Sequence, residues 1–184
     1  MNLNEDKNNI LGVLDELNSF IGLSKCFTNN YKHLQILTLI QNDIFLIQAE
    51  IASPKNVLYK PRKISLDNIR YLEIQTDLYE QEVKTIDHFI IPEGSKFACA
   101  LHCIRTISRR VEREMLKYLK TESGRDFSSI IDLYARYFDR VACLSFALAR
   151  LENNQRGYLE KKPNYYIMDQ PKKRTAQKRG ERDE

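Results

Sequence analysis

Glycine and proline are scarce in this sequence, which has six glycines and five prolines among 184 residues. Both residue types interrupt helices and supply turns, so their scarcity argues against a turn-rich β fold and favours long helices. No apolar run approaches the roughly 18–20 residues that a membrane-spanning helix needs. The polar start, MNLNEDKNN, lacks the features of a signal or transit peptide. We therefore expect a cytoplasmic helical protein with no membrane partner.

Cysteine is also sparse, and none of the four cysteines forms a CxxC pair. In a chain without a signal peptide, such cysteines are expected to be free thiols rather than a disulfide framework. Cys99 and Cys103 lie four residues apart with His102 between them, so one helix face could offer two thiolates. Zinc needs four ligands, and no second Cys/His pair has a useful spacing. We predict that protein residues form no metal site.

Positive charge is concentrated at the C-terminal end of the chain. Between residues 161 and 184, eight lysines and arginines accompany four acidic residues, so the preceding residues are close to neutral. A basic segment of this kind can bind nucleic acid. However, the aromatic residues end at Tyr165 and Tyr166, and no RNA-binding signature accompanies the charges. We predict a folded domain over residues 1–155 and a flexible basic tail over 156–184 that binds no nucleic acid.

Apolar residues recur at helical spacing in five stretches, at about residues 8–24, 31–52, 65–84, 96–121 and 126–152. Pro54 and Pro61 follow the second stretch and cannot continue it as a helix. Ser65 is a suitable N-cap for the third stretch, and Ser95 for the fourth. No alternating strand pattern of useful length competes. The sequence therefore predicts an all-α fold, a five-helix antiparallel bundle.

The fourth stretch carries an apolar stripe and a line of charges beside it. At about 100° per residue, the stripe contains Phe97, Ala100, Leu101, Ile104, Ile107, Val111, Met115 and Leu119. Arg105, Arg109 and Glu112 lie along one border of this stripe, whereas Arg110 points well away and is expected to be solvated. Border arginines can bury their stems and present guanidinium groups to a cleft or interface. Arginine and glutamate at this spacing also stabilise ordinary helices, so both interpretations stay open on spacing alone.

Five segments occur in an order that resembles a known family: GVLDELNSFIGL, LIQNDIFLIQAEIA, FIIPEGS, ALHCIRTISRRVERE and YFDRVACLSFALAR. Together they resemble the PduO-type ATP:cob(I)alamin adenosyltransferases over about residues 10–152. The resemblance implies a five-helix bundle that assembles as a homotrimer, with active sites at subunit interfaces. It also implies transfer of the 5′-deoxyadenosyl group of ATP, bound with Mg²⁺, to cob(I)alamin. The products would be adenosylcobalamin, which an acceptor enzyme could receive, and triphosphate.

The same resemblance implies roles for individual residues. The motif RTxxRRxER places Arg105, Arg109 and Glu112 at positions that line the nucleotide site. Arg105 matches an arginine that pairs with the aspartate of DELN, here Asp15, across a subunit boundary. Phe89 matches the aromatic residue that packs under the corrin ring and blocks the lower axial ligand.

The chain departs from the family pattern in two places. The family motif NRLSD reads DRVAC here, so Arg140 is retained while Asp139 replaces an asparagine that helps to hold ATP and Cys143 replaces an aspartate. A carboxylate at this position repels a triphosphate unless Mg²⁺ or an arginine intervenes. The family's TGDxGxT loop, which wraps the triphosphate, has no counterpart among residues 1–11.

These departures leave three interpretations open. The first and favoured one is a working adenosyltransferase. The second is a non-catalytic family member that keeps a corrinoid or nucleotide pocket as a carrier, chaperone or regulator. The third is a helical scaffold without a ligand, in which the arginines form only salt bridges between subunits of the trimer.

Overall fold

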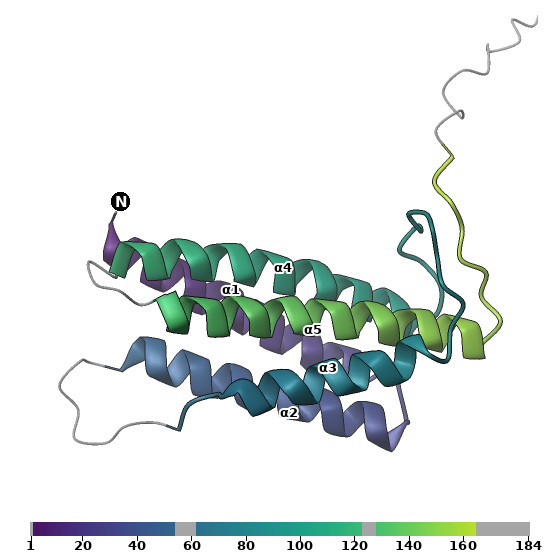
Figure 1. Cartoon of the computed structure of the whole chain (residues 1–184), viewed down its shortest axis with the longest axis horizontal. Coiled ribbons are helices and arrows are strands. Elements are labelled where there is room, and N and C mark those ends of the chain that lie inside the picture. The colour runs from purple at the N-terminus through teal and green to yellow at the C-terminus, as the bar shows by residue number, and fades with distance from the viewer. Residues whose placement is uncertain (1, 54–61, 123–127, 165–184) are drawn as a thin grey trace, which may run out of the picture.

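The computed structural model describes residues 2–53, 62–122 and 128–164. Its elements are α1 (Leu3–Lys25), α2 (Tyr31–Ala52), α3 (Leu66–Glu80), α4 (Lys96–Glu122) and α5 (Ser128–Gln155). These helices run alongside one another as a bundle, and the described ranges contain no strand (Figure 1). The predicted all-α fold with five helices is therefore confirmed.

Polar side chains fix where the helices begin. Asn30 caps α2 by accepting hydrogen bonds from the backbone N–H groups of Lys32 and His33. Ser65 and Asn68 form a reciprocal capping box at the start of α3, which confirms Ser65 as the N-cap. Helix α1 begins at Leu3, earlier than predicted, because its first turn is stabilised by the Asn2 cap rather than by apolar periodicity.

Ser95 fills the same role for α4. Its hydroxyl oxygen accepts a hydrogen bond from the backbone N–H of Ala98 at 3.0 Å, as the sequence predicted. The cap is itself buried, and the Ser95 hydroxyl donates to the carboxylate of Glu152 near the end of α5 at 3.3 Å. The start of α4 is therefore fixed against the end of α5.

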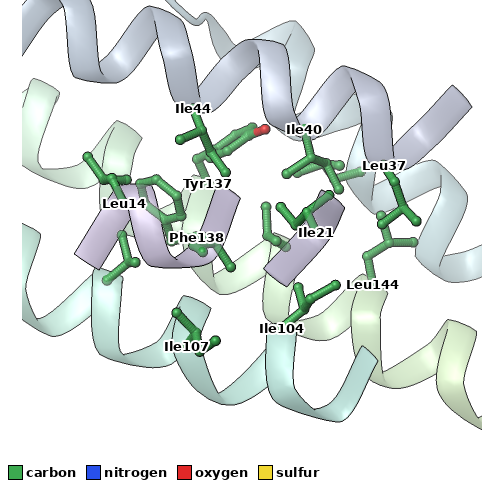
Figure 2. Packing of buried hydrophobic residues seen from close by; sticks show 14 of the residues in the cluster. Leu14, Ile21, Leu37, Ile40, Ile44, Ile104, Ile107, Tyr137, Phe138 and Leu144 are labelled. Atoms are coloured by element: carbon green, nitrogen blue, oxygen red, sulfur yellow. The ribbon is translucent and has the colours of Figure 1, made fainter. Parts of the chain in front are cut away.

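The core runs along the middle of the bundle and draws side chains from all five helices. Figure 2 shows Ile21 of α1, Ile40 and Ile44 of α2 and Ile104 of α4 pointing into it together with the aromatic rings of α5. All eight apolar residues of the predicted α4 stripe are buried. Burial of this apolar surface is the main force that holds the helices together.

Helix α4 packs against both α1 and α5, while α3 packs against α5 and α2 against α1. A groove of about 950 Å³ lies between α2 and α3. At its floor the buried carboxylate of Asp43 accepts hydrogen bonds from the Tyr137 hydroxyl at 2.9 Å and the Asn68 amide at 3.0 Å. Burial raises the pKa of Asp43. None of the described lining residues of this groove belongs to the predicted site.

Residues 156–164 are bonded to the bundle, although they fall in the predicted tail. The backbone N–H of Ile91 donates to the carbonyl of Lys161 at 2.9 Å. Arg150, a buried residue of α5, donates to the carboxylate of Glu160 at 2.6 Å. This segment therefore extends the ordered body beyond the predicted boundary at residue 155. The rest of the predicted tail, with Tyr165 and Tyr166, lies outside the described residues.

Among the described helices, none is both long enough and apolar enough to cross a bilayer.

Candidate active site

The border of α4 that faces α5 carries a network of alternating charges. Arg109 of α4 forms an ion pair through Nη1 with Oε2 of Glu112 at 3.1 Å, and the same Nη1 donates a hydrogen bond to Oδ1 of Asp139 on α5. Arg140 donates through Nε to the other carboxylate oxygen of Asp139 at 3.1 Å. One carboxylate therefore holds two guanidinium groups from different helices. We call Arg105, Arg109, Glu112, Asp139 and Arg140 the arginine cluster.

Arg105 lies one helical turn before Arg109 and rests on an aromatic ring. Its guanidinium carbon lies 5.8 Å from the centre of the Phe146 ring, at a distance typical of a cation–π contact. The Nε atom of Arg105 is buried and has no hydrogen-bond partner in the described structure. Arg105 is thus half-buried beside α5, while its charge is not neutralised by any ion pair among the described residues.

His102 lies near Arg105 and the Phe146 ring, beside the arginine cluster. The imidazole is 5 % exposed and its ring centre lies 6.1 Å from that of Phe146. Burial and the nearby charge of Arg105 lower the pKa of His102 to about 4, so the ring is neutral at pH 7. Its Nδ1 atom, like Nε of Arg105, is buried without a partner among the described residues. Two such atoms therefore lie close together here, one on each of two residues of α4 that contact the Phe146 ring.

The sequence did not identify Phe146 or Arg150 as site residues. The guanidinium carbon of Arg150 lies 6.0 Å from the centre of the Phe146 ring, so this ring contacts two cations. Helical spacing contains a usable signal, because Phe146 follows Asp139 by seven residues and therefore shares its face of α5. Arg150 gives a similar signal, because it follows Phe146 by four residues and Asp139 by eleven, but spacing does not reveal its partners Lys84 and Glu160.

Two predicted site residues, Asp15 and Phe89, lie apart from the arginine cluster within one chain. Asp15 is exposed on α1 and forms no hydrogen bond or ion pair with the described residues. Phe89 lies in the loop between α3 and α4 and is 82 % exposed. Within one chain, the exposed ring of Phe89 and the exposed carboxylate of Asp15 are therefore not assembled with the arginine cluster.

The loop that carries Phe89 is tied to the bundle at both ends. At its start, Arg150 donates a hydrogen bond to the carbonyl oxygen of Lys84 at 2.5 Å. At its end, the side-chain amide of Asn153 donates to the carbonyl of Glu93 at 2.8 Å and accepts from the N–H of Ser95 at 3.1 Å. Because Arg150 also lies over Phe146, which contacts Arg105, one aromatic ring connects the support of the loop to Arg105 of the arginine cluster.

Arg110, on the opposite border of α4, has a side chain that is 42% exposed, so it is in part solvated as the sequence predicted. It also forms an ion pair with Glu16 of α1, and its Nε atom is buried. The helix wheel placed Arg110 correctly away from Arg105, but it did not show that α1 packs against that side of α4. Arg113 is exposed and donates to the backbone carbonyl of Arg109 at 2.9 Å.

The cysteines remain unpaired, and the described residues contain no group of three or more side chains suited to hold a metal ion. Cys103 is exposed and Cys99 is half-buried. Cys143 lies on α5 near Asp139, and burial raises the pKa of its thiol, so the thiol is protonated at neutral pH.

The fold and the arginine cluster together define a class: an all-α bundle in which arginines of two helices, α4 and α5, gather on one face. The sequence profile of the cobalamin adenosyltransferase family matches residues 4–152, and the chain belongs to this family.

Curated relatives agree with this assignment. The chain is 34% identical over 150 residues to a corrinoid adenosyltransferase of Bacillus subtilis (strain 168), covering 79% of this chain and 74% of the relative. It is 34% identical over 160 residues to the corrinoid adenosyltransferase PduO of Citrobacter freundii, covering 85% of this chain and 46% of that longer relative.

A solved structure shares the fold. A variant PduO-type ATP:corrinoid adenosyltransferase from Lactobacillus reuteri, complexed with cobalamin and ATP, superposes with a TM-score of 0.76. The identity is 26%, and the match covers 89% of each chain.

Proposed function

We propose that this chain is a corrinoid adenosyltransferase that moves the 5′-deoxyadenosyl group of ATP to cob(I)alamin, with release of triphosphate. The observation that supports it is the convergence of Arg109 and Arg140 from two helices on one exposed face, with Arg105 beside them on Phe146. This face occurs in a chain of the cobalamin adenosyltransferase family.

The arginine cluster suits the charge that develops in this reaction. As the bond between C5′ and the leaving oxygen breaks, negative charge grows on the triphosphate. Guanidinium groups held next to the phosphate chain stabilise that charge, and they bind phosphate oxygens in a bidentate manner. Arg109 and Arg140 are 49% and 38% exposed, so both can reach a bound phosphate chain. Mg²⁺, brought with ATP, would supply further charge neutralisation at the same oxygens.

Phe89 is proposed to serve the other substrate. Its exposed ring offers an apolar surface to the lower face of the corrin, where it would keep water and the lower axial ligand away from cobalt. The loop that bears it is held by Asn153 and Arg150, so the ring is presented from a fixed backbone.

The assembly is proposed to be a homotrimer with its active sites between subunits. In one chain, the carboxylate of Asp15 has no partner among the described residues, and the charge of Arg105 is not paired. A contact between Asp15 of one subunit and Arg105 of the next would satisfy both. Light scattering tests this: Asp15→Arg and Arg105→Asp should each weaken the trimer, and the double exchange should restore it. A wild-type chain that is monomeric at micromolar concentration would contradict the proposal.

An anaerobic assay tests the activity itself. Cob(I)alamin, saturating MgATP and the protein should give the absorbance of adenosylcobalamin, whereas Arg109→Ala should reduce the rate by about 10²-fold if one guanidinium stabilises the leaving group. Product at no more than the protein-free rate would refute catalysis. The proposed location is the cytoplasm, and the proposed recipient of the product is an adenosylcobalamin-dependent enzyme.

A non-catalytic carrier is the second candidate. It is favoured by the neutralisation of Arg109 and Arg140 by Asp139, which reduces the positive charge available for ATP. Equilibrium dialysis separates the two: corrinoid or nucleotide binding without product formation supports the carrier.

A further inference from the structure

The carboxylate of Asp139 occupies the guanidinium groups that a phosphate chain would need. One of its oxygens accepts from Arg109 of α4, and the other accepts from both Nε and Nη2 of Arg140 on α5. Glu112 forms an ion pair with the same Nη1 atom of Arg109 that Asp139 engages. Without a ligand, the centre of the arginine cluster is therefore already paired with an internal anion.

We propose that Asp139 is a specificity-determining residue: it makes the site prefer a magnesium-bound polyphosphate to the metal-free polyphosphate. This inference rests on the proposed function, because it concerns the same phosphate-binding face. It adds which ionic form of the phosphate chain that face accepts, and which side chain makes the choice.

The first step of the argument is competition. A phosphate chain can reach Arg109 and Arg140 only by displacing Asp139 from them or by sharing them with it. In either case the chain lies close to the Asp139 carboxylate, because that carboxylate lies between the two guanidinium groups. The side chain of Asp139 is 24% exposed, so it is accessible from solvent. Ion pairs with this degree of exposure add little to stability and can be exchanged for a ligand.

The second step is charge. The arginine cluster contains three arginines and two carboxylates, so its net charge is only one positive unit. The repulsion between Asp139 and a bound anion increases with the charge of that anion. Metal-free ATP or tripolyphosphate carries about two more negative charges than its magnesium complex. Asp139 therefore penalises the metal-free form more strongly than the complex.

The third step is that no other described carboxylate of the arginine cluster is bonded to both Arg109 and Arg140. Glu112 pairs with the same Nη1 atom of Arg109 as Asp139 does, but it forms an ion pair with neither Arg140 nor Arg105 in the described structure. Arg105 rests on Phe146 and forms no ion pair with the described carboxylates. Asp139 is thus the described carboxylate that both phosphate-facing arginines share.

The test uses tripolyphosphate as a probe, with the full chain and constant ionic strength. Calorimetric titrations with and without Mg²⁺ are compared for wild type, Asp139→Asn and the control Glu16→Gln. The control removes a carboxylate that pairs with an arginine on the opposite border of α4. Asp139→Asn should tighten metal-free tripolyphosphate by ~10-fold and the magnesium complex by about 3-fold, while Glu16→Gln changes neither appreciably. The preference for the complex should therefore decrease only in the Asp139 variant.

Equal or weaker binding of metal-free tripolyphosphate by Asp139→Asn would overturn the inference, as would the same change in Glu16→Gln. Asp139→Ser should also bind metal-free tripolyphosphate more tightly and show a smaller preference for the magnesium complex. The inference can therefore be tested even if one of the two variants does not fold. If wild type forms adenosylcobalamin but Asp139→Asn keeps the wild-type preference for Mg²⁺, this inference fails and the proposed function stands. If neither wild type nor the variants bind tripolyphosphate, both fail.

Discussion

A Cβ atom placed on Gly94 would lie 2.0 Å from the side-chain amide oxygen of Asn153. The backbone of Gly94 has φ 126°, in a region that residues with a side chain rarely adopt. Asn153 approaches this closely because its amide bonds the backbone on both sides of Gly94, at Glu93 and Ser95. The last turn of α5 thereby fixes the entry to α4.

Gly94→Ala should therefore lower the free energy of unfolding, by about 2–4 kcal/mol, through backbone strain and the displaced Asn153 amide. Gly12→Ala is the matched control, because Gly12 lies in α1 with nothing within 4 Å of an added Cβ. That change should stabilise the helix by about 0.5–1 kcal/mol. Chemical denaturation measures the free energy of unfolding of both variants and of wild type. The same change in both variants would contradict this account of Gly94.

Phe89→Ala should separate function from stability. Because its ring is 82 % exposed, removing it should change the free energy of unfolding by no more than about 0.5 kcal/mol. Adenosylcobalamin formation should nevertheless fall by at least about 10-fold, since the corrin loses its apolar support. Phe45→Ala, which removes a ring 61 % exposed on α2, should leave both quantities unchanged. Unaltered turnover in Phe89→Ala would exclude a role for this ring.

The stability of the protein should depend on pH through His102. Its pKa in the folded chain is lowered to about 4 by burial and by Arg105, whereas the unfolded chain titrates near 6.5. Between these two pKa values, His102 is protonated in the unfolded chain and neutral in the folded chain. The free energy of unfolding should therefore have its full value above pH 6.5 and should decrease as the pH falls towards 4, by up to about 3 kcal/mol.

The comparison that isolates this contribution is His102→Asn against wild type across that pH range. In the variant, the free energy of unfolding should change much less with pH between 6.5 and 4. Some of this pH dependence should remain because of His33, whose pKa is also lowered by burial. Asp43 contributes with the opposite sign, since burial raises its pKa and protonation then favours the folded state. Parallel curves for the two proteins would show that His102 is not the titrating group.

Arg150→Met should loosen the segment that follows α5. It removes the cation that binds Glu160 and the carbonyl of Lys84, and should cost about 2–3 kcal/mol. Limited proteolysis should then cleave within residues 156–164, which the wild type protects. Arg70→Met is the control, because Arg70 and its partner Asp67 are 70% and 84% exposed. That change should cost less than about 0.5 kcal/mol and expose no new cleavage site.

The bundle was largely predictable from local patterns. Helix α2 has the bounds that its apolar spacing and the flanking Pro54 predicted, and the eight-residue stripe of α4 is buried as expected. Periodicity works here because each of these helices has one side against the core and one side facing away from it. It also placed Arg109 on a border of the stripe, where the structure brings it to Asp139.

The rest of the site depends on contacts that periodicity does not encode. The sequence could not show that Asp139 is bound by Arg109, because that pairing depends on how α4 and α5 are aligned along their length. Nor could it show that Arg150 joins Lys84 to Glu160, since the three residues are distant in the chain and carry no motif. The ion pair of Arg110 was missed for the same reason, because its partner Glu16 belongs to another helix.

The Phe146 ring contacts two guanidinium groups that hold different parts of the structure, since Arg105 belongs to the arginine cluster and Arg150 binds the Phe89 loop and the segment after α5. Replacing this one ring therefore removes a contact from both groups at once. A design that changes the support of the Phe89 loop through position 146 will also change the surroundings of Arg105, so the two regions cannot be varied independently from that residue.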